Sequence, residues 1–318
     1  MASDRLVVIL VALTANIILA VAKFGAFLLT GSASMLAETY HSISDSGNQI
    51  LLLIGMYYSR KRPDQRHPFG YGKATFFYAF LVSVLLFGIA GWESVRHGVS
   101  AVREGASLPA GTVSIGDSVF PAVYLAYAIL LITILLDGIS YWKARQAMDV
   151  ETEERGWRGI LDAFRRTSDM PVLAVLTENA IAAVGAFIAL VAIFLSRQLD
   201  MPWIDAVGAI AIGVLLMSFA IALGIENKRL LIGESLTAQH ERPLERIIRE
   251  ADGVVDVVEL RTLYFGADSV VVTADIAFKP DLDTEEIDER ITAIEAAIRR
   301  EEPLVEKIYI EPELQDSR

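Results

Sequence analysis

A histidine and an aspartate stand four residues apart in a long apolar stretch of the chain, residues 33–58. On a helix, residues four apart lie on one face, a turn from each other, so His41 and Asp45 can bind the same ion. A neutral imidazole nitrogen and a carboxylate oxygen are ligands that zinc accepts at about 2.0–2.2 Å, usually in sets of four. Glu38 and Asn48 fall in the same stripe, within about 80° of rotation around the helix. The pattern predicts a metal site on this face; the alternative is a polar stripe that only hydrogen-bonds to neighbouring helices.

Two adjacent polar residues interrupt a second apolar stretch, residues 171–196. Glu178 is the best candidate to complete the site, because it adds a second carboxylate, whereas Asn179 points about 100° away around the helix. The alternative is that Glu178 extends outward to the nearby polar end of its helix. The expected ligands are first His41, Asp45 and Glu178, and then Asn48, Asn179 or a water molecule.

Three further charged residues lie in apolar stretches, where each charge is costly: Lys23, Glu93 and Asp137. We expect structural ion pairs here, in which each acid pairs with Lys23 or with an arginine.

A second, weaker cluster lies in the polar loop after residue 59, where Asp64 and His67 are three residues apart. Two ligands hold a divalent cation poorly, so a surface hydrogen bond between them is an equal alternative. The other two histidines, His97 and His240, have no acidic or imidazole neighbour at ligand spacing, and we expect both to be solvated.

The composition narrows the class of protein. Of the 318 residues, 53% are hydrophobic and 21% are charged, and the mean hydropathy is +0.44, which is more apolar than a typical soluble domain. The chain has no cysteine, which excludes disulfides, thiolate metal sites and a cysteine nucleophile, and it has four histidines. A net charge of −12 argues against nucleic acid as a partner. No nucleophile–base pair and no phosphate-binding loop is present, so we do not expect an enzyme or an organic cofactor.

Six stretches are long and apolar enough to span a bilayer, which takes about 20 residues. Five bases follow the second stretch, between residues 59 and 75, and six follow the fourth, between 143 and 166, whereas the other loops hold few. Because basic loops stay in the cytoplasm, both termini are predicted to be cytoplasmic. The fold class expected is an α-helical membrane protein with six transmembrane helices, at residues 6–30, 33–58, 76–99, 119–143, 171–196 and 203–225.

Residues 227–318 form a different, acidic part, with 22 acids and 12 bases. Their periodicity predicts the order αββαβ, with a helix over 238–251, strands over 254–261 and 269–278, a helix from the cap Asp283 to Arg300, and a strand over 306–310. We expect a small antiparallel sheet with its helices on one face, and two domains, 1–226 and 227–318. Residues 144–170, with Trp157 and Phe164 at helical spacing, predict an amphipathic helix at the membrane surface or a solvated linker helix.

Taken together, these features resemble a known family. The sequence His41-Ser-Ile-Ser-Asp45, the loop His67-Pro-Phe-Gly-Tyr-Gly-Lys73, the six apolar stretches and the αββαβ tail are similar to those of the cation diffusion facilitators. The resemblance covers essentially the whole chain. It implies a homodimeric zinc exporter, driven by proton antiport, with its transport site between the second and fifth spans. The membrane expected is the cell (inner) membrane. It also implies that the tail is a ferredoxin-like cytoplasmic dimerisation domain.

Carried over by position, the resemblance gives His41 and Asp45 the two ligand positions of the second span. Asp64 and His67 match the first two ligands of a loop site in some members, but Tyr71 stands at the third position. Lys73 matches a lysine of a charge interlock at the dimer interface, for which Glu234 is the nearest acid in this chain.

The fifth span departs from the family pattern. A second His-x-x-x-Asp would place its ligands at Leu176 and Ala180, which cannot bind metal, and Glu178 lies between them. A Glu-Asn pair in this span, together with Asn48-Gln49 after the first motif, resembles the zinc transporter 9-like branch of the family.

The function expected is Zn²⁺/H⁺ antiport by alternating access. Manganese, iron or cobalt are alternative cargoes, since oxygen ligands suit them and zinc is favoured mainly by His41. A passive metal pore without proton coupling, or a membrane metal sensor or scaffold without transport, is a further alternative.

Overall fold

The computed structural model of the chain describes residues 2–105, 111–115, 118–155, 170–267 and 269–313. The chain divides into two compact units. The first, called the helical unit below, comprises Met1–Ile50 and Val82–Ala222; the second, called the mixed unit, comprises Leu51–Leu81 and Leu223–Arg318.

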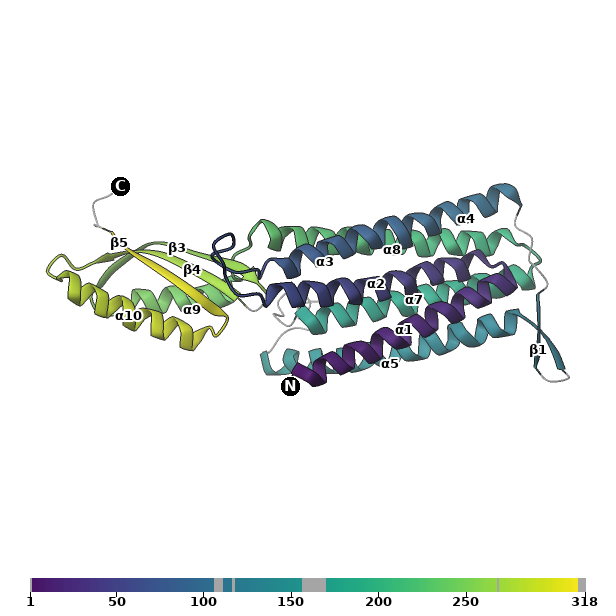
Figure 1. Ribbon diagram of the computed structural model, residues 1–318, viewed down its shortest axis with the longest axis horizontal. Helices are drawn as coiled ribbons and strands as arrows, with labels where there is room; N and C mark the ends of the chain where they lie inside the picture. Colours follow the sequence, from purple (N-terminus) through teal and green to yellow (C-terminus); the bar gives the residue numbers. More distant parts are fainter. Residues whose placement is uncertain (1, 106–110, 116–117, 156–169, 268, 314–318) are drawn as a thin grey trace. The chain divides into compact units, whose positions relative to one another are not determined.

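Helices follow each of the six apolar stretches, and those of the helical unit run alongside one another (Figure 1). The third stretch is one continuous helical run in which a π-helical segment, η1, separates two α-helices. The bounds are α1 Ala2–Thr30, α2 Ala33–Ser59, α3 Ala74–Leu85, η1 Leu86–Trp92, α4 Glu93–Glu104, α5 Val123–Arg155, α7 Met170–Gln198 and α8 Trp203–Ile232.

Within the described residues, five helical segments are long and apolar enough to cross a membrane. They are Leu13–Thr30, Ala74–Glu104, Val123–Gln146, Leu176–Gln198 and Trp203–Ile232. The helix α2 has a similar length, 27 residues, but falls outside this group. Its polar side chains account for the difference, since they replace apolar residues along one stripe. The sixth span therefore stays a prediction.

Small residues bring the helices of this unit close together. A Cβ atom on Gly91 of η1 would lie 2.4 Å from Cγ of Met217 on α8, and one on Gly213 of α8 would lie 2.7 Å from the carbonyl oxygen of Gly91. The backbones of these two helices touch because neither glycine carries a side chain. The buried core of the unit is accordingly rich in alanine, with Ala186, Ala189 and others fully covered.

The start of α2 is fixed by an acid from a distant part of the sequence. Asp205 of α8 accepts hydrogen bonds from the backbone nitrogens of Ala33, at 2.6 Å, and of Ser34, at 3.3 Å, and from the hydroxyl of Ser32, at 2.9 Å. Ser34 returns a bond to the backbone carbonyl of Asp205, at 2.8 Å. A carboxylate at a helix N-terminus satisfies otherwise unpaired N–H groups and interacts favourably with the helix dipole. Asp205 therefore anchors the helix that carries the polar stripe.

Two segments differ from their predictions. Residues 118–121, expected at the start of a span, form the strand β2, Ser118–Pro121, which pairs antiparallel with β1, Thr112–Ile115. The helix α5 continues to Arg155, so the first part of the predicted amphipathic segment prolongs this helix. The remainder of that prediction, including Trp157 and Phe164, lies outside the described residues.

The tail has the predicted element order, α9 Ala238–Arg249, β3 Val254–Gly266, β4 Ser269–Phe278, α10 Thr284–Glu301 and β5 Val305–Glu313. The strands form one sheet in the order β3-β4-β5. The expectation of an antiparallel sheet is half wrong: β3 and β4 are antiparallel, but β4 and β5 are parallel, with Val270 opposite Val305 and Ala277 opposite Glu313. The reason is the connection, because a strand that returns through a helix comes back in the same direction. The ferredoxin-like assignment stays a prediction.

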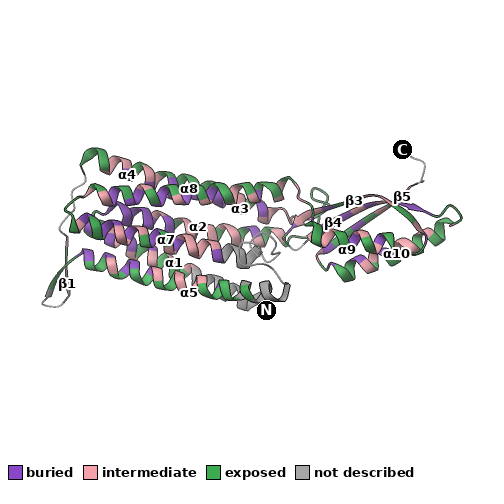
Figure 2. Cartoon of the chain, turned by 180° about the vertical axis from the view of Figure 1, so that it is seen from behind, coloured by how far each residue is buried: buried purple, intermediate pink, exposed green. Residues whose placement is uncertain are grey.

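One face of this sheet is covered by its helices. Alternate residues of β4, Val270, Val272, Ala274 and Ile276, are buried and pack with side chains of α9 and α10 (Figure 2). The predicted cap of α10 is confirmed: the Asp283 side chain accepts from the backbone nitrogens of Glu285 and Glu286, and the Glu286 side chain accepts from the Asp283 nitrogen.

We predict that Asp205→Ala lowers the free energy of unfolding by about 1–3 kcal/mol, because it leaves two buried N–H groups of α2 without an acceptor. Thermal unfolding of the purified chain in detergent measures this. Glu104→Ala, which removes an exposed acid from the same unit, is the control and should leave the midpoint unchanged. Equal midpoints for the two variants would contradict the anchoring role of Asp205.

Candidate functional site

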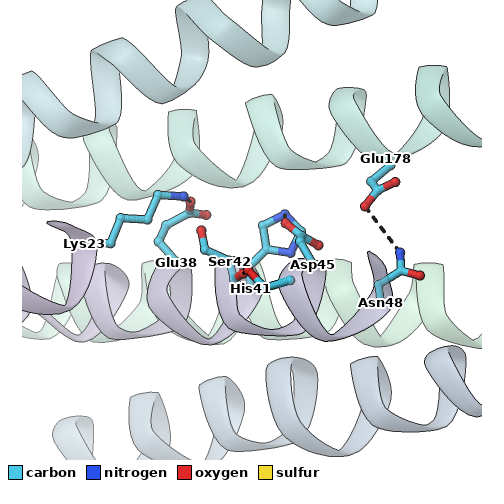
Figure 3. Close-up of polar contacts among 8 residues, drawn as sticks. Lys23, Glu38, His41, Ser42, Asp45, Asn48 and Glu178 are labelled. Carbon is cyan, nitrogen blue, oxygen red and sulfur yellow. Dashed lines mark hydrogen bonds and ion pairs between the residues drawn. The ribbon is translucent and has the colours of Figure 1, made fainter. Parts of the chain in front are cut away.

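The polar stripe of α2 lies in the interior of the helical unit. Nε2 of His41 is 3.5 Å from Oδ2 of Asp45, and the two side chains are 3% and 17% exposed (Figure 3). The one-turn spacing of the sequence thus places an imidazole and a carboxylate side by side, as predicted. The distance is that of an ion pair, and it does not meet hydrogen-bond geometry, since both ring nitrogens of His41 lack a hydrogen-bond partner among the described residues.

Several other buried polar atoms of α2 also lack a partner among the described residues. A buried polar atom without a hydrogen bond costs about 1–3 kcal/mol, so native proteins retain few of them. Their concentration on one helix indicates that something other than this chain completes them. They are Glu38 Oε1, Ser44 Oγ, Asn48 Oδ1 and Gln49 Oε1.

Glu178 of α7 faces α2. Nδ2 of Asn48 donates to Oε1 of Glu178 over 3.4 Å, across the space between the two helices (Figure 3). The side chain of Glu178 is half-buried and directed to α2, in contrast to the outward-pointing alternative. Asn179, the next residue, is half-buried on the same helix. Leu176, one of the two positions where the family pattern has a ligand, is buried as an ordinary apolar residue.

These side chains do not form a ready-made metal cage. Among the described residues, no three histidine, aspartate or glutamate side chains lie close enough together to hold an ion. The structure brings His41 to Asp45, and Asn48 to Glu178, as two neighbouring pairs on facing helices. A metal that bound both carboxylates would have to draw α7 and α2 together or change their rotamers.

The pairing of Lys23 differs from its prediction. Its ammonium group donates to Oε2 of Glu38 over 2.8 Å, and both side chains are buried. Glu93, expected to pair with Lys23 or with an arginine, pairs with Arg96 of its own helix, at 3.1 Å, as one of these two alternatives. From the sequence we grouped Glu38 with the metal stripe, and its spacing gave no sign that α1 supplies its counter-ion.

Comparison with known proteins decides the family. The family model described as "Cation efflux transmembrane domain" matches residues 9–232, and that described as "Cation efflux protein, cytoplasmic domain" matches residues 236–314. The first match alone covers more than half of the chain. The chain belongs to the cation diffusion facilitator family.

Among curated relatives of this cation diffusion facilitator, Metal tolerance protein C4 of Arabidopsis thaliana is 30% identical over 272 residues, which are 86% of this chain and 55% of that protein. The mitochondrial proton-coupled zinc antiporter SLC30A9 of Homo sapiens is 25% identical over 271 residues, 85% of this chain and 45% of that protein. The chain thus spans about half the length of these two relatives. Magnetosome protein MamM of Paramagnetospirillum magneticum is 24% identical over 96% of this chain and 87% of that protein.

Solved structures titled as the CTD of MamM are also similar to part of this chain. The cadmium form of one variant of that domain has a TM-score of 0.24 and 20% identity, and covers 26% of this chain and 100% of that one.

In this cation diffusion facilitator the loop cluster matches the hydrogen-bond alternative. Oδ1 of Asp64 accepts from the backbone nitrogens of Arg66, at 2.9 Å, and His67, at 2.8 Å, while Oδ2 accepts from the hydroxyl of Tyr71, at 2.7 Å. Both oxygens of Asp64 therefore hold the turn, and the His67 ring is 3.5 Å away, stacked near Tyr71. The Tyr71 hydrogen bond, followed by that of the His67 nitrogen, lowers the pKa of Asp64, and the same contact with Asp64 raises the pKa of Tyr71.

The loop after Asp64 packs within the mixed unit. The ring of Phe69 lies 5.6 Å from that of Phe265 on β3, and a Cβ on Gly72 would lie 2.5 Å from the Phe265 carbonyl oxygen. Lys73 donates to the carbonyl oxygen of Leu231, at 3.3 Å.

The predicted partner of Lys73, Glu234, instead forms an ion pair with Arg229, and no Lys73–Glu234 pair exists in the described part of this chain. A charge interlock between these two residues within one chain is therefore not what the structure shows. His240, which we expected to be solvated, binds Glu302 through Nδ1 at 2.6 Å. The two residues are 62 positions apart, so no local spacing could have indicated the contact.

We predict that His67→Ala leaves zinc binding by the purified protein unchanged, because Asp64 is committed to the turn.

Tyr71→Phe should raise the pKa of Asp64 toward its ordinary value, because it removes the hydrogen bond that lowers this pKa most. Since the pKa is lowered in the folded chain, the turn is stable above the ordinary carboxylate range and is lost as the pH falls through the lowered pKa. Equilibrium zinc binding and carboxylate NMR titration measure the two effects. A loss of one bound zinc in His67→Ala would show that the loop is a metal site after all.

Proposed function

We propose that this cation diffusion facilitator is a proton-coupled exporter of divalent cations with Zn²⁺ as its cargo. The observation that carries the proposal is the buried His41–Asp45 pair, whose imidazole has no hydrogen-bond partner among the described residues although it lies in the interior of the unit. An intramembrane ionisable residue marks an ion pathway more often than a structural contact. Zinc as the cargo is supported by the imidazole donor and by the zinc antiporter among the relatives.

The ion would bind to His41 and Asp45 of α2 and Glu178 of α7, with Asn48, Asn179 or a water molecule as the fourth ligand. Binding would replace the hydrogen bond between Asn48 and Glu178, in which 3.4 Å separates Nδ2 from Oε1. One neutral imidazole and two carboxylates balance the charge of a divalent cation. A loaded site is therefore neutral, which lowers the cost of holding it in a medium of low dielectric constant.

Proton coupling follows from the same ligands. A metal binds only the neutral imidazole and the ionised carboxylates, so binding releases protons and protonation releases the metal. A histidine with an ordinary pKa of about 6.5 titrates in the range that cells use. Exposure of the site alternately to the cytoplasm and to the outer side would then exchange zinc for protons without a separate proton path.

The arrangement proposed for the whole protein is a homodimer with six spans and both termini in the cytoplasm, in the cell (inner) membrane. The basic loops after α2 and α5 support this orientation. The match of residues 236–314 to the cytoplasmic domain of the family supports a domain boundary near residue 227 and a dimer formed by the tail. Manganese, iron and cobalt are the competing cargoes, because two of the three preferred donors are carboxylates.

The test is metal-dependent proton flux in proteoliposomes, with an imposed pH gradient and a panel of divalent cations. We predict that zinc uptake depends on the gradient, and that His41→Ala and Glu178→Ala each reduce it at least about tenfold, the loss that even outer-shell partners of metal ligands cause. Glu104→Ala, which removes an exposed acid far along the chain from the proposed ligands, is the matched control and should transport at the wild-type rate.

Each contrary outcome identifies a different error. Zinc movement that ignores the pH gradient would exclude antiport in favour of a passive pore. Undiminished transport in Glu178→Ala would remove α7 from the site, and undiminished transport in both His41→Ala and Asp45→Ala would overturn the site altogether. Transport of manganese with no transport of zinc would contradict the assignment of zinc as the cargo.

A further inference from the structure

The proposed function does not use the buried ion pair between Lys23 and Glu38, although Glu38 stands only three residues before His41. Lys23 lies on α1 and Glu38 on α2, with 2.8 Å between Nζ and Oε2 and side chains 3% and 0% exposed. The desolvation cost of such a pair often exceeds the attraction it gains, so a pair of this kind is weak as a source of stability. Its position within an apolar layer requires another explanation.

Glu38 belongs to the same face of α2 as the proposed ligands. Glu38 precedes His41 by three residues, which is about one helical turn. The side chains of Glu38, His41 and Asp45 lie along one stripe (Figure 3). Asn48 lies beyond Asp45 on this stripe, with Glu178 of α7 opposite it, and Glu38 lies at the other end of the stripe, toward the turn between α1 and α2. The pair thus stands at the end of the stripe opposite the basic loop that follows α2.

The second oxygen of Glu38 is uncommitted and faces α7. Oε1 has no hydrogen-bond partner among the described residues, and a Cβ on Gly185 would lie 2.7 Å from it. Gly185 is seven residues, about two turns, after Glu178, so both lie on one face of α7. The absence of a side chain at Gly185 leaves room for a carboxylate on the α2–α7 seam that the proposed site also occupies.

We infer that Lys23 is a tethered counter-ion that keeps Glu38 from acting as a further metal ligand and closes the ion route at this end. The inference rests on the proposed site at His41, Asp45 and Glu178. The ammonium group pairs with Glu38 and interacts electrostatically with His41, Asp45 and Asp137. While Lys23 occupies Glu38, the proposed ligands include two carboxylates, Asp45 and Glu178; without Lys23, Glu38 would be available as a third, and the cation would leave more slowly.

A counter-ion role predicts the direction in which each substitution shifts the zinc affinity, whereas a packing role predicts no such direction. Removing the ammonium alone frees an anionic carboxylate one turn from His41, so zinc should bind more tightly. Removing the carboxylate alone leaves an uncompensated cation beside the site, so zinc should bind more weakly. Removing both returns the net charge to that of the wild type.

The experiment is a zinc titration of the full-length protein in detergent, with Lys23→Met, Glu38→Gln and the double variant. We expect Kd to fall about tenfold in the first and to rise about tenfold in the second, the order expected for one unit charge acting on a divalent ion across a partly buried site. The double variant should lie within about threefold of the wild type, because its net charge is unchanged. In proteoliposomes, Lys23→Met should lower KM and kcat together. The control is the exposed pair Glu93–Arg96 of the same unit, whose variants Glu93→Gln and Arg96→Met should leave Kd unchanged.

A charge swap, Lys23→Glu with Glu38→Lys, tests the inference if either single variant fails to fold. It preserves the ion pair but puts the ammonium on α2, so zinc should bind more weakly than in the wild type; wild-type affinity would show that only the pairing matters. Affinities that shift in the same direction in both single variants, or not at all, would likewise overturn the counter-ion role. Failure of the proposed function is recognised separately, by wild-type zinc affinity in His41→Ala.

Discussion

The cost of placing polar groups in an apolar layer is the constraint on which the rest of this structure depends. The helix α2 carries four such groups on one face, Glu38, His41, Asp45 and Asn48, and each must find a partner or be completed by a ligand. Glu38 finds Lys23, and Asn48 finds Glu178, whereas the imidazole of His41 faces Asp45 without a hydrogen bond. The same stripe keeps α2 out of the group of helices that are apolar enough to be recognised as spans by composition.

A site built from two facing helices works only if the register between them is fixed. Asp205 sets the start of α2 through its bonds to Ser32, Ala33 and Ser34, which places the stripe at a defined depth. Close contacts at Gly91 and Gly213 join η1 to α8, the helix that carries Asp205. The anchor of α2 is therefore itself held by backbone packing, while Asn48 and Glu178 link α2 to α7 at the proposed site by a long hydrogen bond. The short hydrogen bonds to Asp205 lie at one end of α2, and the long one lies at the proposed site.

Local sequence patterns predicted several of these features, whereas the long-range pairings could not be predicted from the sequence. The one-turn spacing of His41 and Asp45 and the capping sequence at Asp283 are properties of a few adjacent residues, and both appear as expected. The ligand roles of His41, Asp45 and Glu178 stay predictions, as does the sixth span. The partners of Lys23, Asp205 and His240 are 15, at least 171 and 62 residues away, where sequence spacing gives no information. The parallel pairing of β4 and β5, by contrast, followed from the helix between them and could have been predicted.

Charge balance connects the pair at one end of the stripe with the proposed site at its centre. Lys23 and Glu38 cancel each other, so Asp45 and Glu178 supply the carboxylate charge of the proposed ligand set, while Asp137 of α5 acts on the same groups electrostatically. Two carboxylates and a divalent cation sum to zero, and two carboxylates and two protons also sum to zero. With either occupant the site is neutral, which lowers the cost of holding it at low dielectric constant, whereas the empty, ionised site carries a net charge there. A transporter that must exchange the two needs no more than this equality, provided that no further carboxylate joins the set. In the proposed arrangement the ammonium group on α1 meets that condition for Glu38.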